Sequence, residues 1–231
     1  MIKAVGTKRT KTKDTDLISE SKQKKEQEEE YVFLPFQNPD SFNPNVLKDD
    51  KELEDRGIII IDNYICKETL SRASKRLLIL HFNDNFTDEI QIILNSPGGD
   101  CDAGWAFIDL MSFVKNNIKT VAMGEICSMA TSIFIAGDHR VMSPNCMAMI
   151  HQFSEYGHGG KYGDLVAKGK MWQMEHDKDI AHLIKYSKYK TKEQIKKNIL
   201  KEYDNWLSPS EMKKHGLCDE IYQPTRNTRR K

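Results

Sequence analysis

Short aliphatic runs and longer amphipathic segments alternate along the chain from residue 57 onward. The short runs are typical of buried strands, and they cover residues 58–61, 90–94, 120–123 and 148–151. Between them, apolar residues recur at helical spacing over 67–82 and 101–115, which predicts two helices. This rhythm predicts an α/β fold of parallel strands joined by crossover helices. In such folds, functional groups gather near the carboxyl ends of the strands.

The pattern changes after residue 151. A glycine-dense segment at 157–163 predicts a hairpin, and the apolar spacing beyond it predicts a long helix over 164–186. Shorter helices are expected near 192–200 and 208–215. We therefore expect one folded domain over residues 57–222. The basic residues 223–231 are expected to form a frayed, solvated end.

The segments before residue 57 have a different composition. Residues 1–30 contain eight Lys or Arg and seven Asp or Glu, with too few apolar residues to offset the entropy of ordering, so we predict a disordered tail. Residues 31–56 begin with aromatic residues interleaved with prolines, which is typical of an irregular arm. The arm is expected to lie on a partner, on a neighbouring subunit or on its own domain.

Composition excludes several classes of protein. The chain has 35 Lys and Arg against 34 Asp and Glu, so a net charge of +1 gives no reason to expect a nucleic acid or an anionic membrane as partner. The longest unbroken aliphatic run, 58–61, is far too short to span a bilayer, and no apolar segment follows the basic N-terminus as in a secretory signal. Five cysteines without a C-x-x-C pair argue against a disulfide framework and a zinc site, and favour a reducing compartment such as the cytoplasm.

The first candidate for chemistry is the turn Asn95-Ser96-Pro97-Gly98-Gly99, which follows a predicted strand and precedes a helix. Paired glycines allow backbone conformations closed to other residues and let a bound chain or a developing anion approach main-chain N–H groups. A purely structural turn has the same sequence features. The turn matches neither the phosphate-binding loop nor the dinucleotide fingerprint.

The second candidate is Ser128, at the predicted start of an apolar helix that runs to Gly137. Serine at a helix start is commonly a cap for free N–H groups. The same position suits a nucleophile, because free N–H groups and the helix dipole would stabilise an oxyanion. The neighbouring Cys127 is an alternative nucleophile, although it also fits a small buried apolar residue.

Two further residues stand at the ends of predicted elements. His151 ends the strand in Met149-Ile150-His151-Gln152, and Asp204 lies just ahead of the predicted helix start at Ser208. Taken singly, each has an ordinary structural interpretation: a strand-end histidine, and a carboxylate that flanks a helix.

Taken together and in this order, these signals resemble the proteolytic subunit of the Clp protease family. The resemblance covers about residues 56–222 and implies the ClpP/crotonase-like fold of stacked β-α-β units. The motifs on which it rests are Asn95-Ser96-Pro97-Gly98-Gly99, Ser128-Met129, Met149-Ile150-His151-Gln152, Asp204 and Gly216-Leu217-Cys218-Asp219.

The resemblance implies a serine endopeptidase. Ser128 would be the nucleophile, His151 the general base and Asp204 the carboxylate that orients the imidazole. The backbone N–H groups of Gly99 and Met129 would form the oxyanion hole, and an extended substrate would bind along Gly98 and Gly99. No metal or other cofactor is implied, because in this family only a partner unfoldase uses ATP.

The resemblance also implies an assembly. A helix and strand within 156–186 would protrude as a handle through which subunits interlock. Relatives form heptameric rings, stack two rings into a closed chamber and receive unfolded polypeptides from an AAA+ unfoldase such as ClpX or ClpA. Binding through main-chain hydrogen bonds would give broad cleavage specificity.

Three departures from the family pattern keep other interpretations open. Phe153 stands where relatives have proline, Glu202-Tyr203 replaces the Asp-Arg pair that bridges two rings, and no N-terminal hairpin is evident. The chain is therefore also compatible with a weakly active ring subunit of structural or regulatory role. Further alternatives are a specialised maturation peptidase of this fold, a signal-peptide peptidase of this fold, which generally uses a Ser-Lys dyad, and an acyl-CoA enzyme of the crotonase type.

Overall fold

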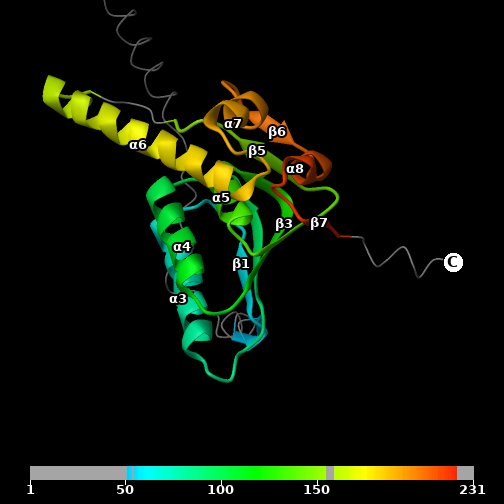
Figure 1. Ribbon diagram of the computed structural model, residues 1–231. Coiled ribbons are helices and arrows are strands. Elements are labelled where there is room, and N and C mark those ends of the chain that lie inside the picture. Colours follow the sequence, from blue (N-terminus) through cyan, green and yellow to red (C-terminus); the bar gives the residue numbers. More distant parts are fainter. Residues whose placement is uncertain (1–50, 54, 155–158, 223–231) are drawn as a thin grey trace, which may run out of the picture. The chain divides into compact units, whose positions relative to one another are not determined.

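The computed structural model describes residues 51–53, 55–154 and 159–222 (Figure 1). The predicted tail at 1–30, most of the predicted arm at 31–56 and the basic end at 223–231 lie outside the described residues.

Within the described part of the chain, seven strands form one sheet with the order β1-β2-β3-β4-β7 and with β5 and β6 branching from β3. The strands are β1 (Ile58–Ile61), β2 (Ile90–Ser96), β3 (Ile118–Cys127), β4 (His139–Met142), β5 (Met147–Ile150), β6 (Asn205–Leu207) and β7 (Glu220–Ile221). All neighbours pair in parallel except β5 and β6, which are antiparallel. The predicted α/β fold is confirmed.

Six helices follow β1 in the described residues. They are α3 (Lys67–Phe82), α4 (Cys101–Phe113), α5 (Met129–Ile135), α6 (Tyr162–Tyr186), α7 (Lys192–Asn198) and α8 (Pro209–His215). The helices α3, α4 and α5 pack together on one side of the sheet (Figure 1). Fully buried side chains fill the space between these helices and the strands, among them Leu77 of α3, Phe107 of α4 and Phe134 of α5.

A bulge in β3 shapes the sheet at its centre. The pairing of β3 with β2 shifts between Leu94 and Ser96, and β3 has two extra residues on its side. Gly124 takes a left-handed conformation there, φ 67°, and the Glu125 N–H donates a hydrogen bond to Asn95 Oδ1 at 3.2 Å. Before the bulge β3 pairs with β4, and beyond it β3 pairs with β5. The bulge thus lets one strand serve two neighbours.

The segment after β5 differs from the prediction. Residues 155–158 are outside the described residues, residues 151–154 and 159–161 have no regular secondary structure, and α6 begins at Tyr162. The hairpin predicted over 157–163 is therefore wrong at its C-terminal end, where Tyr162 and Gly163 are helical. The predicted strand of the handle stays a prediction. No helix in the described residues is long and apolar enough to cross a membrane.

Candidate active site

Three parallel strands end at the same edge of the sheet, and one of the candidate site residues predicted from the sequence follows each of them. Gly98 comes two residues after β2, Ser128 directly follows β3, and His151 directly follows β5. The register pairs Cys127 with Met149, so the ends of β3 and β5 lie side by side. Parallel pairing therefore brings together residues that are far apart in sequence.

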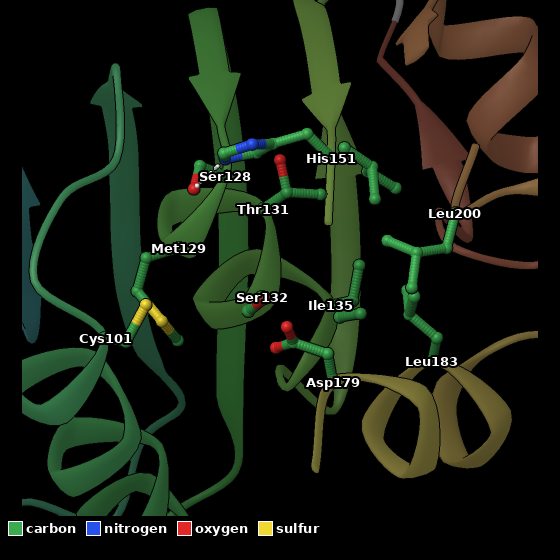
Figure 2. Close-up of a pocket in the computed structure, with 11 residues that line it drawn as sticks. Cys101, Ser128, Met129, Thr131, Ser132, Ile135, His151, Asp179, Leu183 and Leu200 are labelled. Atoms are coloured by element: carbon green, nitrogen blue, oxygen red, sulfur yellow. Dashed lines mark hydrogen bonds between the residues drawn. The ribbon is translucent and has the colours of Figure 1, made fainter. Parts of the chain in front are cut away.

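Ser128 and His151 are in direct contact. The distance between Ser128 Oγ and His151 Nε2 is 2.7 Å (Figure 2). Ser128 has φ 53°, and it is the one non-glycine residue with positive φ among those the structure describes. Its side chain makes no capping hydrogen bond to α5. The interpretation of Ser128 as a side-chain cap is wrong, because its hydroxyl faces the imidazole instead.

Backbone hydrogen bonds hold this junction in place. The Ser128 N–H donates to the Met149 carbonyl at 2.8 Å, which ties the end of β3 to the end of β5. Thr131, buried in the first turn of α5, donates its hydroxyl to the Ile126 carbonyl at 2.8 Å. Sequence reasoning missed Thr131. The sequence signal that could have identified Thr131 is a hydroxyl residue three positions after Ser128, within the first turn of the predicted helix.

The glycine turn approaches Ser128 closely. Gly98 has φ 92°, and a Cβ atom at Gly98 would stand 2.5 Å from the Cys127 carbonyl oxygen and 2.9 Å from Ser128 Cβ. Gly99 has φ 147°, and its Cβ would meet the Ile65 carbonyl oxygen at 2.2 Å. Both positions therefore require glycine for conformation and for space.

Two N–H groups next to Ser128 have no acceptor among the described residues. Gly99 lies in a parallel bridge in which the Ile65 N–H bonds to the Gly98 carbonyl and the Asp100 N–H to the Ile65 carbonyl, both at 2.8 Å. In such a bridge the N–H of the central residue points to the opposite edge. Met129 is the first residue of α5, so its N–H has no partner within the helix.

Asp204 lies near this edge but does not bond to the histidine. It directly precedes β6, and Asn205 of β6 pairs with Ile150, so one further step of the antiparallel register places Asp204 opposite His151. Asp204 is exposed, and within the described residues no hydrogen bond joins it to His151. The structure thus brings the serine, the histidine and the glycines together and leaves the aspartate nearby without contact.

Cys127 is a poor alternative to Ser128. Its side chain is buried. Burial, followed by the negative charges of Glu125 and Asp204, raises the pKa of the Cys127 thiol to about 11. A thiol that keeps its proton at neutral pH is a weak nucleophile. Its surroundings fit the interpretation of Cys127 as a small buried residue.

A pocket opens beside Ser128 and runs between α5 and α6 (Figure 2). Apolar side chains from both helices line it, including Met129, Ile135 and Leu183. Asp179 of α6 stands at the end of the pocket opposite Ser128 (Figure 2). Burial, and secondarily the charge of Glu175, raises the pKa of Asp179 to about 7. Sequence reasoning missed this carboxyl group. In the described residues, no group of three or more His, Cys, Asp or Glu side chains is placed to hold a metal ion.

The fold and this site define a class of protein: parallel α/β domains in which a serine and a histidine meet at neighbouring strand ends beside a glycine turn. A family model described as Clp protease matches residues 45–225. The chain is 32% identical over 174 residues to the ATP-dependent Clp protease proteolytic subunit of Streptococcus mutans serotype c, covering 74% of this chain and 86% of the relative. The protein of the same name from Streptococcus pyogenes serotype M5 is 33% identical over 175 residues, with 74% and 86% covered. The chain belongs to the Clp protease family, and the resemblance found in the sequence is confirmed.

Proposed function

We propose that this protein is a serine endopeptidase that hydrolyses peptide bonds of unfolded polypeptides inside an oligomeric chamber. The observation that carries the proposal is the 2.7 Å contact between Ser128 Oγ and His151 Nε2. An aliphatic hydroxyl is a poor nucleophile at neutral pH until a base takes its proton, and a contact of this length places the imidazole to do so.

In the proposed reaction, Ser128 Oγ attacks the carbonyl carbon of the scissile bond while its proton passes to His151 Nε2. The C–N bond then breaks, and the amine leaves with that proton. Water, activated by His151, hydrolyses the resulting ester and frees the serine. For Nε2 to accept a proton, the neutral imidazole must carry its own proton on Nδ1.

The N–H groups of Gly99 and Met129 are proposed to bind the oxyanion. Neither has an acceptor within the described residues; Met129 directly follows Ser128, and Gly99 directly follows Gly98, which approaches Ser128 closely. Donors placed in advance around the developing charge commonly supply a large part of catalysis. The substrate is proposed to lie along Gly98 and Gly99 as an added strand.

Asp204 is proposed to orient His151 through Nδ1. Its position one step beyond the Ile150 and Asn205 pair supports this role. Because no hydrogen bond joins the two side chains within the described part, the proposal requires the segment before β6 to move toward the imidazole. Substrate binding or assembly would supply that movement, since catalytic hydrogen bonds often tighten only in the working complex.

Assembly into heptameric rings, singly or as a stacked pair, and supply of substrate by an AAA+ unfoldase are proposed from the family. Relatives are named as subunits of an ATP-dependent protease. Exposed apolar residues on α6 support an interface there: Tyr162, Leu165, Val166, Met171 and Met174. The five cysteines are free thiols, which supports the proposed cytoplasmic location.

The test is hydrolysis of a short fluorogenic peptide by the purified protein. Ser128→Ala is expected to abolish turnover and to leave the assembly mass unchanged, because the side chain makes no structural hydrogen bond other than to His151. Ser112→Ala, at an exposed serine of α4, is the matched control and should keep full activity. Turnover that survives in Ser128→Ala would refute the assigned nucleophile.

A weakly active ring subunit is the second candidate function. The observation that favours it is that Asp204 is exposed and shares no hydrogen bond with His151 within the described residues. Strong peptidase activity from rings of this chain alone would exclude it. Activity that appears only after a second catalytic chain is added would support it.

A further inference from the structure

The pocket beside Ser128 has a lining suited to one kind of side chain. It is a small pocket, with about 40 Å³ open to the centres of water-sized molecules. The buried side chains of Met129, Ile135 and Leu183 form apolar walls. Such walls suit the methylene stem of a long side chain.

Asp179 gives the far end of this pocket a charge. Within the described residues, no hydrogen bond or ion pair reaches its carboxyl group, although that group faces the pocket (Figure 2). Glu175 and Leu183 lie one turn before and after it, on the same face of α6. Leu183 is buried in the core, so Asp179 stands on the stripe of α6 that faces the domain.

The nearby cation is already engaged elsewhere. Lys178 pairs with Glu175, with 2.6 Å between Nζ and Oε1. Trp105 donates its indole N–H to the other oxygen of Glu175 at 3.0 Å. Glu175 thus has two partners while Asp179, one turn further along the same face, has neither.

A partly buried carboxyl group without a partner is unfavourable when it is ionised. That penalty raises the pKa of Asp179 to about 7. A cation delivered into the pocket would remove the penalty and stabilise the ionised form. The chemistry of the pocket therefore complements a ligand with an aliphatic stem and a positive head.

We infer that Asp179 determines specificity, and that the pocket binds a lysine or arginine side chain of the substrate on the acyl side of the cleaved bond. The carbonyl that Ser128 attacks belongs to this residue, so its side chain is the one nearest the pocket mouth. The inference rests on the proposed peptidase function. It adds to broad main-chain binding a preference for a cationic residue at the cleavage point.

The experiment compares two peptides that differ by one group. They carry lysine or norleucine before a fluorogenic leaving group, so the stem is the same and the ammonium is present or absent. The wild-type protein is expected to cleave the lysine peptide with a kcat/KM about 10- to 100-fold higher, as for a hydrogen bond to a charged group. Asp179→Asn should bring this ratio close to one, and Asp177→Asn, at an exposed position on the same helix, should leave it unchanged.

The outcomes separate this inference from the function on which it rests. A serine-reactive fluorophosphonate reports on Ser128 in every sample, including any variant that folds poorly. If Ser128 is labelled and the wild-type protein cleaves norleucine as well as lysine, the inference is wrong and the peptidase function stands. If Ser128 is not labelled and neither peptide is cleaved, the proposed function fails and the inference fails with it.

Discussion

The two halves of the candidate site are built in different ways. Ser128 and His151 follow parallel strands near the middle of the sheet, and backbone hydrogen bonds tie the two strand ends together. Asp204 precedes β6, a strand of three residues that pairs only with β5 in the described sheet. The serine and histidine meet at 2.7 Å, whereas the exposed aspartate makes no hydrogen bond to the histidine. The paired strand ends thus hold the contact that is proposed for proton transfer, whereas the short β6 segment carries the carboxylate that is proposed to support it.

The largest effect should come from the half that the core fixes. His151→Ala removes the base and is expected to lower kcat by about 10⁵-fold or more, as in other enzymes where serine and histidine act as a unit. Peptide hydrolysis by His151→Ala, by Ser128→Ala and by the double variant measures this. The double variant should be no slower than either single one. Additive losses would show that the two residues do not act together.

Changes at Asp204, the less firmly held half of the site, should lower kcat by a smaller factor. Asp204→Asn is expected to lower kcat by about 10³- to 10⁴-fold and to leave KM nearly unchanged, because the imidazole loses its orienting charge while substrate contacts persist. Steady-state kinetics on a short peptide tests this value, with Asp177→Asn as control. A loss below about tenfold would mean that Asp204 stays away from His151 in the working enzyme.

The glycine turn tests how tightly the fixed half is packed. Gly98→Ala is expected to destabilise the protein by about 3 kcal/mol and to abolish activity, because its Cβ would stand 2.5 Å from the Cys127 carbonyl oxygen at a φ of 92°. Denaturant unfolding measures the change. Gly169→Ala is the matched control, since a Cβ there meets no atom within 4 Å and α6 should gain about 0.5–1 kcal/mol. Equal effects at both sites would contradict the packing argument.

The smallest effect concerns Asp179, at the far end of the pocket. Its pKa is raised to about 7, so between about pH 4 and 7 the folded protein binds this proton more tightly than the unfolded chain. The contribution of Asp179 to stability therefore falls as the pH rises through that window. The Asp179→Asn variant should be more stable than the wild-type protein by about 2 kcal/mol at pH 8 and equally stable near pH 4. The gain is smaller than the full desolvation cost of an ionised carboxylate, because the carboxyl group of Asp179 is partly open to solvent through the pocket.

Asp177, on the same helix, is expected to contribute to stability with the opposite pH dependence. Hydrogen bonds from the Gln173 and Lys192 side chains lower the pKa of Asp177, so its contribution is present at neutral pH and is lost in acid. Asp177→Asn should therefore lower stability at neutral pH. Chemical unfolding of both variants across this pH range would check the contrast, and a neutral-pH gain for both would contradict it.

Local sequence patterns were sufficient where an element is determined by its own residues. The four consecutive isoleucines predicted β1, and the apolar spacing predicted α3, each with the boundaries found in the structure. The strands β4, β6 and β7 were missed because they are short and gain their form from pairing with neighbours. The prediction for β3 stopped at residue 123, where the bulge at Gly124 breaks the regular pattern.

The same limit applies to the site. Ser128, His151 and the glycines were singled out because each stands at the end of a predicted element, and the family resemblance then supplied their proposed roles. Asp179 was missed because an acidic residue within a charged amphipathic helix is usually a solvated one. Only its position one turn before Leu183, on the buried stripe, set it apart. Which neighbour that stripe meets depends on how α6 packs on α5, and sequence spacing contains no such information.

The backbone at Ser128 has a consequence for how such a protein can change over time. At φ 53° this position suits glycine better than any residue with a side chain, so Ser128→Gly should relieve strain that Ser128→Ala retains. Selection for stability alone would therefore favour the single substitution Ser128→Gly, which removes the hydroxyl. A serine in that conformation is expected where the hydroxyl performs the proposed chemistry at a cost in stability.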